Sequence, residues 1–360
     1  MTASDPPPPC EDVPSTMSAM WLTGHGGYDR LAWRTDVPTP RAGPGEVLIR
    51  VGAAGLNNTD INTRIGWYAQ QGDDQGAVTD GAWAGDAMAF PRIQGADVCG
   101  RIVALGTGVA APRLGQRVLV QSCLVSLRGD GPDIWLGSER DGGFAQYVAV
   151  PAADAHAIDS PLSDVELASF PCSYGTAENL LTRSGVASGE RVLVTGATGG
   201  LGSAAVQLAA RRGAEVIAVV SADKRDACAD LGAARLVTRD DDLRTVLGEN
   251  SLDVVIDGVG GPGFTCLPDL LKPRGRYAVS GAVAGAMVSL DLRKLYLKDL
   301  TFFGCTAQEA EVFQALVGHI ARGEVRPMVA AVFPLQDLVA AQEMFLARRH
   351  VGKLVVVPPA

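Results

Sequence analysis

The sequence has no excess of basic residues, few aromatic residues and no pair of closely spaced cysteines. Lys and Arg number 31 against 40 Asp and Glu, which gives a net charge of −9, whereas a nucleic-acid surface needs clustered basic charge. The seven cysteines are scattered singly, a pattern typical of a reducing compartment rather than of a disulfide framework. These absences argue against a nucleic-acid partner and favour a cytoplasmic protein.

The sequence also shows neither a secretion signal nor a membrane span. Residues 1–16 lack the basic and apolar regions of a signal peptide, and their proline and acidic content predicts a disordered N-terminal extension. The longest uncharged stretch, residues 192–210, contains too much glycine and threonine for a membrane helix. We therefore expect no membrane partner.

That same stretch lies in the most informative part of the sequence, residues 191–221. An apolar run, a glycine-rich turn, an alanine-rich helical stripe and a second apolar run follow one another in about 30 residues, which is one βαβ unit. Ala197, Gly199 and Gly202 have the spacing of the dinucleotide fingerprint, with Ala in the first place. Small residues there let a pyrophosphate approach the backbone at the N-terminus of the helix.

The two sides of this unit differ in pattern. Before it, short alternating runs punctuated by Gly and Pro predict an all-β region, and residues 70–89 predict a long loop. From Ser163 onward strands alternate with helices, which predicts a doubly wound parallel sheet. We expect helices over residues 224–231 and 290–298, and we expect the end of the chain, from a helix over 312–322 onward, to return to the first region.

Several segments, in their order along the chain, resemble the motifs of one enzyme family. They are GPGEVLIRV, GLNNTD, GADVCGRIVALG, GQRVLV, DGGFAQYVAVP, TGATGGLG, DVVIDGVGG, LKPRGRYAVSGA and GKLVVV, and they span about residues 17–357. In these the chain resembles the medium-chain dehydrogenase/reductase superfamily, and within it the zinc-free quinone oxidoreductase branch, which includes zeta-crystallin.

The resemblance implies an α/β protein of two domains. A GroES-like β-barrel catalytic domain would cover residues 17–160 and 305–360, and a Rossmann domain with a doubly wound parallel sheet would cover 161–304. The active site would lie in the cleft between them. The apolar strand Leu300–Gly304 is where the family pairs its subunits, so the resemblance and the exposed edge both predict a homodimer.

The resemblance also implies that the chain holds no metal. Zinc members carry Cys where this chain has Asn57, and His-Glu where it has Ala96-Asp97; only the third ligand position is retained, as Cys172. One thiol and one amide do not supply the three ligands of a catalytic zinc. Isolated histidines at positions 25, 156, 319 and 350 are expected to be packed or surface residues.

Without a metal to act as Lewis acid, the implied reaction is hydride transfer to a quinone or to the C=C bond of an α,β-unsaturated carbonyl compound. The residues that would line the substrate are Asn57, Thr59, Asp60 and Tyr68. Asn57 would donate its amide N–H to the carbonyl oxygen, and Tyr68 or water would deliver the proton. Asn62 stands where many relatives have a second tyrosine.

The implied cofactor is NADPH. Its expected contacts are Ala197, Thr198, Gly199, Gly200, Leu201 and Gly202 in the glycine turn, Ser221, Lys224, Arg225 and Arg239 after the second and third strands, and Val259, Gly260, Ser280, Gly281 and Ala282 near the nicotinamide. NAD-specific sites place a carboxylate at the end of the second strand, whereas this strand ends at Ser221 and two basic residues follow. Asp223 is a complication, because its carboxylate could turn inward.

Two other functions remain open from the sequence. One is a zinc-independent alcohol or aldehyde dehydrogenase with Thr59 as proton relay. The other is a catalytically silent NADPH-binding protein. Turnover of quinones and enones would separate the reductase from the silent protein, and oxidation of saturated alcohols in the presence of a chelator would favour the dehydrogenase.

Overall fold

The computed structural model describes residues 13–69, 88–127, 129 and 133–360, and its contacts divide the chain into two compact units. Unit 1 comprises Met1–Cys172, Pro327–Arg349 and Lys353–Ala360, and unit 2 comprises Ser173–Arg326 and His350–Gly352. The predicted loop over 70–89 and the predicted extension over 1–16 lie largely outside the described residues.

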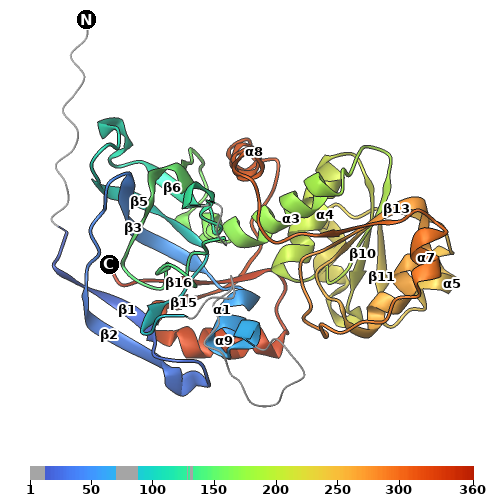
Figure 1. Ribbon diagram of the computed structural model, residues 1–360, viewed down its shortest axis with the longest axis horizontal. Coiled ribbons are helices and arrows are strands. Elements are labelled where there is room, and N and C mark those ends of the chain that lie inside the picture. The colour runs from blue at the N-terminus through green and yellow to red at the C-terminus, as the bar shows by residue number, and fades with distance from the viewer. Residues whose placement is uncertain (1–12, 70–87, 128, 130–132) are drawn as a thin grey trace, which may run out of the picture. The chain divides into compact units, whose positions relative to one another are not determined.

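Unit 1 is built mainly from antiparallel strands (Figure 1). Its larger sheet has the order β15-β16-β3-β5-β6-β8, with β7 also paired to β3, and a smaller sheet has the order β2-β1-β4. The strands are β1 Thr16–Leu22, β2 Leu31–Pro38, β3 Glu46–Gly55, β4 Arg92–Ile93, β5 Val98–Leu105, β6 Arg117–Val120, β7 Tyr147–Pro151, β8 Ala155–Ala157, β15 Val329–Pro334 and β16 Lys353–Val357.

Strand β3 organises this unit, because it pairs with β5, β7 and β16. The apolar side chains of these strands meet those of α9, Leu338–Ala347, in one core. The pairing also has a local consequence. The Leu56 N–H donates to the Leu354 carbonyl at 2.9 Å, so the end of β3 and the start of β16 are fixed side by side.

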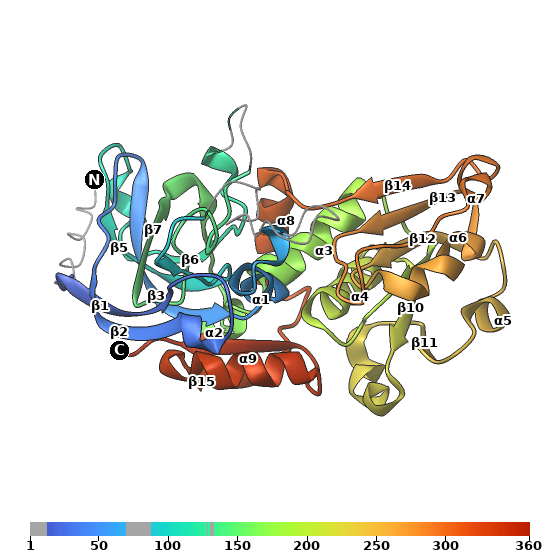
Figure 2. The same cartoon turned by 60° about the horizontal axis from the view of Figure 1, so that its bottom comes forward.

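Unit 2 is a parallel sheet with the strand order β11-β10-β9-β12-β13-β14 (Figure 2). The strands are β9 Arg191–Val194, β10 Glu215–Val220, β11 Arg235–Thr238, β12 Leu252–Asp257, β13 Leu271–Val279 and β14 Thr301–Gly304. In chain order this is 3-2-1-4-5-6, the order of the doubly wound dinucleotide-binding sheet. The predicted fold class is therefore confirmed.

The α-helices among the described residues are short apart from four. They are α1 Asn58–Arg64, α2 Asp164–Leu167, α3 Pro171–Arg183, α4 Gly200–Arg211, α5 Leu243–Leu247, α6 Leu267–Leu270, α7 Leu292–Tyr296, α8 Ala310–Ala321 and α9. None of the helices in the described part of the chain is long and apolar enough to cross a membrane.

The predicted helix over 224–231 is not an α-helix. The chain forms two 3-10 segments there, Ala222–Lys224 and Asp226–Leu231, with the Cys228 N–H donating to the Arg225 carbonyl three residues back. Gly232 ends the second segment with a φ of 94°, which a residue with a side chain rarely adopts.

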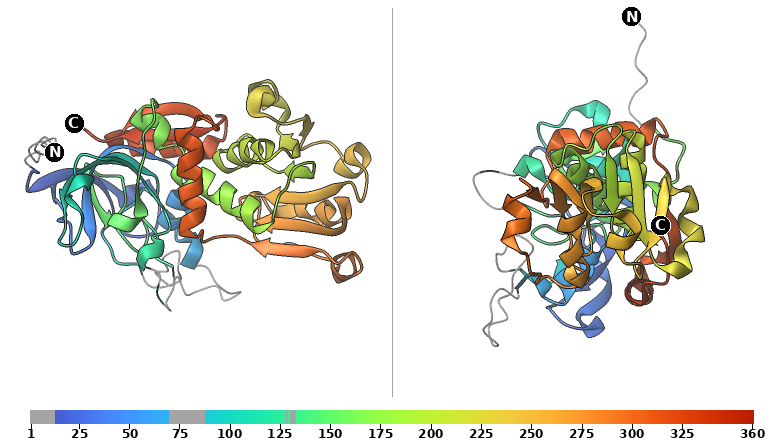
Figure 3. Two further views of the ribbon diagram at one scale, coloured as in Figure 1. Left: turned by 90° about the horizontal axis from the view of Figure 1, so that it is seen from above. Right: turned by 90° about the vertical axis from the view of Figure 1, so that its right-hand side faces the viewer.

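The boundaries of the two units also differ from the predicted domain boundaries. Residues 161–172 lie in unit 1, where Asp164 accepts from Arg117 at 2.6 Å. Residues 305–326 lie in unit 2, where α8 crosses α3 (Figure 3). The Ala307 carbonyl accepts from Asn179 at 3.0 Å, and His319 of α8 lies 3.9 Å from the Glu178 carboxylate.

Candidate functional site

The glycine turn of unit 2 lies between β9 and α4. Gly196 has a φ of 59°, and the Ala197 N–H donates to the Val219 carbonyl of the neighbouring strand at 3.0 Å. Gly202 sits so close to the turn that a Cβ there would lie 2.2 Å from the Gly196 carbonyl oxygen. Only glycine fits at this place, and it allows the helix to start directly against the strand.

Gly199 lies in more open surroundings than Gly202. It is the N-cap of α4, it is exposed, and an added Cβ would meet nothing closer than the Gly196 oxygen at 3.7 Å. The fold itself would accept a side chain there. The first turn of α4 begins immediately after it, so the N–H groups of Gly200, Leu201 and Gly202 point out of the helix end. The open space on the Cβ side of Gly199, at a helix N-terminus, fits a pyrophosphate.

The residues expected to contact the adenosine end gather where β10 and β11 finish. Val220 and Thr238 are paired in register, so Ser221 and Arg239 follow neighbouring strand ends. Arg239 is exposed, whereas the Lys224 ammonium donates to the His350 carbonyl at 2.9 Å. The Ser221 hydroxyl hydrogen-bonds the Asp223 carboxylate and lowers its pKa. Asp223 therefore does lie beside the strand end.

The two turns expected near the nicotinamide are tied together by one buried residue, Asp257. Asp257, at the end of β12, accepts from Val259 N at 2.8 Å and Gly260 N at 3.1 Å, and its carbonyl accepts from Ser280 N at 3.2 Å. Thr195 and Tyr277 also donate to it, each at 2.6 Å. A Cβ on Gly281 would lie 2.5 Å from the Gly258 carbonyl oxygen, so this contact requires glycine.

In unit 1, the candidate reaction site begins at the N-terminus of α1. Asn57 is the N-cap, its backbone N–H donates to the Asp60 carboxylate at 2.7 Å, and the two residues form a capping box. Both are buried, and the carbonyl of Asp60 accepts from Gln94 at 2.9 Å. The predicted residues Asn57 and Asp60 thus act first as the structural start of this helix.

The Asn57 side chain is held by a buried ion pair. Lys353, the first residue of β16, donates to Asn57 Oδ1 at 2.6 Å and to Asp97 Oδ2 at 2.7 Å. Asn57 Nδ2 in turn donates to Asp97 Oδ2 at 2.9 Å. Lys353 and Asp97 are 3% and 0% exposed, which for a charged pair requires such complete pairing. A direct contact of Asn57 with substrate would require its amide to leave these partners.

Thr59 and Tyr68 form a second group beside the first. The Tyr68 hydroxyl, in the 3-10 segment Trp67–Ala69, donates to Thr59 Oγ1 at 3.3 Å and accepts from Asn62 Nδ2 at 3.4 Å. Burial raises the pKa of Tyr68, so its hydroxyl keeps its proton at neutral pH. The half-buried Tyr68 is a hydrogen-bond donor close to Cys172 and Asp60, which both act on it electrostatically.

Asp60 is the titratable group of this site with the most altered proton affinity. Burial raises its pKa from 3.8 to about 7, with a further rise from the negative charge of Asp97. Its hydrogen bonds from Asn57 N and Gly95 N and the charge of Lys353 oppose that rise. Asp60 therefore exchanges a proton in the physiological range.

Lys353 and Asp257 were not among the predicted site residues. Each had a signal in the sequence: Lys353 directly precedes the apolar run of GKLVVV, and Asp257 directly follows the apolar run of DVVIDG. A charged residue at such a place is seldom buried unless it is paired. Of the predicted lining residues, the structure brings Asn57 and Asp60 together at the buried start of α1. It also joins Thr59 and Tyr68 beside them through a hydrogen bond between their hydroxyls.

Comparisons with known proteins agree with this organisation. The family model for the alcohol dehydrogenase GroES-like domain matches residues 43–160, and the model for zinc-binding dehydrogenases matches residues 200–322. The crystal structure of a candidate alcohol dehydrogenase from Sinorhizobium meliloti 1021 is 46% identical, covers 96% of this chain and 98% of its own, and has a TM-score of 0.90.

More distant relatives include reductases of unsaturated substrates. Acryloyl-coenzyme A reductase of Metallosphaera sedula is 28% identical over 94% of this chain and 99% of its own length. Quinone oxidoreductase of Homo sapiens is 24% identical over 95% and 98%. The 2-octenoyl-CoA carboxylase reductase CinF, solved with NADP and 2-octenoyl-CoA, is 26% identical over 96% and 88%, with a TM-score of 0.82.

The doubly wound sheet with its glycine turn, carried in one chain with a GroES-like unit, defines the class of nicotinamide-dependent oxidoreductases with two domains. Within that class, the chain belongs to the medium-chain dehydrogenase/reductase superfamily.

Proposed function

We propose that this protein is a cytoplasmic, NADPH-dependent reductase that transfers hydride to a quinone or to the C=C bond of an α,β-unsaturated carbonyl compound, without zinc. The observation that carries the proposal is the cluster of Asn57, Asp97 and Lys353. In this cluster the Lys353 ammonium group is the cation bound by Asn57 and Asp97, which stand where zinc members carry Cys and Glu. The names of the acryloyl-coenzyme A reductase and quinone oxidoreductase relatives support the same substrate class.

The donor set supports reduction without zinc. A catalytic zinc needs three protein ligands, mostly Cys, His or Glu. Among the described residues no group of three or more His, Cys, Asp and Glu side chains is close enough to hold a metal ion. The Asp97 carboxylate, which could serve as a ligand, is already bound by Lys353, by Asn57 and by the N–H of Cys172 at 2.5 Å.

In this mechanism NADPH, when bound, supplies the hydride. The carbonyl or quinone oxygen gains negative charge as the double bond is reduced, and this is the charge that the protein must stabilise. The Tyr68 hydroxyl, with its proton retained, is the group of unit 1 suited to donate a hydrogen bond to that oxygen and then its proton. In the structure the Tyr68 O–H donates to Thr59, so donation to substrate requires this O–H to turn from Thr59 to the carbonyl oxygen while Asn62 continues to donate to the Tyr68 oxygen. The proton that Tyr68 gives up is replaced from water.

NADPH rather than NADH is the finer part of the proposal. Arg239 is exposed at the end of β11 and can pair with a 2′-phosphate, and Ser221 can donate to it. Lys224 contributes positive charge from its place against His350, and Arg225 lies exposed next to it. Asp223 opposes this preference, because a carboxylate there suits a ribose hydroxyl better than a phosphate.

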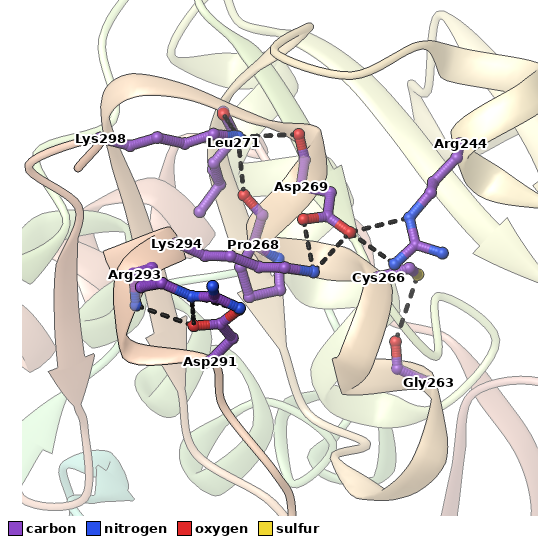
Figure 4. A network of polar contacts seen from close by, with 10 residues as sticks. All are labelled: Arg244, Gly263, Cys266, Pro268, Asp269, Leu271, Asp291, Arg293, Lys294 and Lys298. Atoms are coloured by element: carbon purple, nitrogen blue, oxygen red, sulfur yellow. Dashed lines mark hydrogen bonds and ion pairs between the residues drawn. The ribbon is translucent and has the colours of Figure 1, made fainter. Parts of the chain in front are cut away.

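We also propose a homodimer joined through the edge strand β14. The neighbouring segment exposes large apolar side chains, with Met287 92%, Leu292 64%, Tyr296 62% and Leu297 71% exposed. Figure 4 shows the polar contacts that hold α7 and the residues after it: Lys294 reaches Asp269 at 2.7 Å, and Lys298 donates to three backbone carbonyls. A rigid apolar edge of this kind favours pairing with a second copy.

A zinc-independent alcohol dehydrogenase is the second candidate. The 46% identical structure from Sinorhizobium meliloti is described as a candidate alcohol dehydrogenase, and the contact of Tyr68 with Thr59 could relay a proton outward as well as inward.

A substrate panel separates these functions. The purified protein is incubated with a chelator and then assayed with NADPH against quinones, enones and enoyl-CoA esters, and with NADP and NAD against saturated alcohols. We expect turnover of at least one unsaturated class and no loss of it in the chelator. Turnover confined to saturated alcohols would support the dehydrogenase, and NADPH binding without any turnover would support the silent protein.

A further inference from the structure

Lys353 is the one residue of the buried cluster that comes from the far end of the sequence. It opens β16, while Asn57 and Asp97 follow β3 and precede β5. The hydrogen bond from Leu56 N to Leu354 O places the head of β16 against the N-terminus of α1. The register of the sheet therefore brings the ammonium to Asn57.

The three members of the cluster, Lys353, Asn57 and Asp97, are all buried. Lys353 donates to Asn57 and Asp97, Asn57 donates to Asp97, and the second oxygen of Asp97 accepts from the backbone N–H of Cys172. A Cβ on Gly55 would lie 2.7 Å from Asp97 Oδ2 and 2.6 Å from the Ala168 carbonyl oxygen. The chain thus leaves just enough room for the carboxylate, and the three polar side chains hold one arrangement.

We propose that Lys353 is a positioning residue of the reaction site, whose buried ammonium fixes Asn57 and the first turn of α1 and thereby sets the directions of Thr59 and Tyr68 toward substrate. This inference deepens the proposed reductase function and rests on it. It gives Asn57 a role through α1 rather than through a contact with substrate.

The test must separate positioning from simple stability, because removal of one partner from a buried ion pair destabilises a protein strongly. Lys353→Met removes the charge at similar length. Val356→Ala is the matched control, since this residue lies in the core on the same strand and makes no part of the cluster. Lys272→Met removes a partly exposed Lys–Asp pair of unit 2, with 2.8 Å to Asp253, and controls for the loss of a lysine charge.

Two properties of each variant are compared with those of the wild type. Each protein is measured at the temperature at which its free energy of unfolding has the same value. The first is hydrogen exchange of the backbone amides of α1, and the second is turnover of the best unsaturated substrate. We expect Lys353→Met to accelerate exchange in α1 more than Val356→Ala does, and to lower kcat by roughly 10²-fold, as a small misplacement of reacting groups can. The dissociation constant for NADPH should stay unchanged in both, as should turnover in Lys272→Met.

A double variant, Lys353→Met with Asp97→Leu, gives a second test. Apolar replacement of both members of a buried pair often restores stability. Low turnover and fast α1 exchange in a variant of restored stability support positioning. Equal α1 exchange in Lys353→Met and Val356→Ala at matched stability, or turnover that returns with stability in the double variant, overturns it. A wild type without turnover rejects the proposed reductase, while the exchange data still decide the role of Lys353.

Discussion

At the first turn of α1, the Asp60 carboxyl group lies in the interior with two backbone N–H groups as its donors and Asp97 and Lys353 as its charged neighbours. Its pKa is about 7 in the folded chain and 3.8 in the unfolded chain. Between these values the folded state binds more protons than the unfolded state. This group therefore makes the protein less stable as pH rises from about 4 to about 7.

We predict that Asp60→Asn removes this pH dependence. From about pH 5 to about pH 8, the free energy of unfolding of the wild type should fall relative to that of the variant, by on the order of a few kcal/mol. Urea unfolding at several pH values measures the difference. Asp240→Asn, at an exposed position in unit 2, is the control and should leave the slope unchanged. Parallel stability curves for wild type and Asp60→Asn would contradict the prediction.

Tyr68 is the residue on which the proposed chemistry depends most directly. Tyr68→Phe removes the hydroxyl donor, and loss of one donor to a developing oxyanion typically lowers kcat by ~10²–10³-fold. The KM for NADPH should not change, because the expected cofactor contacts lie in unit 2. Tyr296→Phe, at a largely exposed tyrosine, is the control for the substitution itself. Full turnover in Tyr68→Phe would show that water alone supplies the proton.

At the scale of elements, the glycine turn before α4 has two roles, in the packing of the fold and in cofactor binding, and two of its glycines separate them. Gly202→Ala should lower the midpoint of thermal unfolding, because its Cβ would lie 2.2 Å from the Gly196 oxygen. Gly199→Ala should leave that midpoint nearly unchanged and weaken NADPH binding by about tenfold or more, because its Cβ would occupy the approach of the pyrophosphate. Calorimetry and cofactor titration measure the two effects, and unchanged cofactor affinity in Gly199→Ala would place the pyrophosphate elsewhere.

The ends of β10 and β11 carry the prediction on cofactor choice. Arg239→Ala should lower kcat/KM with NADPH by about tenfold or more and leave NADH unaffected, since only the 2′-phosphate needs this cation. Asp223→Asn should shift the ratio toward NADPH. Arg235→Ala, at the opposite end of β11, is the matched control. An equal loss with both cofactors in Arg239→Ala would argue against a phosphate contact there.

The elements were predictable from the sequence wherever a single pattern decides them. Hydrophobic runs and the glycine fingerprint predicted β9, α4 and β10, because these form from neighbouring residues. The pairing of Lys353 with Asn57 was not predictable from pattern, since it depends on the register between strands nearly 300 residues apart. The helix predicted over 224–231 forms as two 3-10 segments rather than one α-helix, a difference that composition does not reveal.

For the whole molecule, assembly is the main prediction. Leu297→Glu should dissociate the proposed dimer, because a buried carboxylate at an apolar interface has no partner. Light scattering at micromolar concentration measures the mass. Val332→Glu, at an exposed apolar position of β15 in unit 1, is the control and should leave the mass unchanged. A wild type that is monomeric under these conditions would reject the dimer.

The placement of Lys353 has a consequence for how the protein becomes active during its synthesis. Unit 2 is almost complete once the ribosome has released residue 326, and its sheet can form at that stage. Asn57 and Asp97 are made far earlier, but their cation arrives only with β16. Until then the Asp97 carboxylate lacks its ammonium partner, and its burial is unfavourable in free energy. The pairing of Asn57 and Asp97 with Lys353 therefore has to wait until the chain has been synthesised through β16.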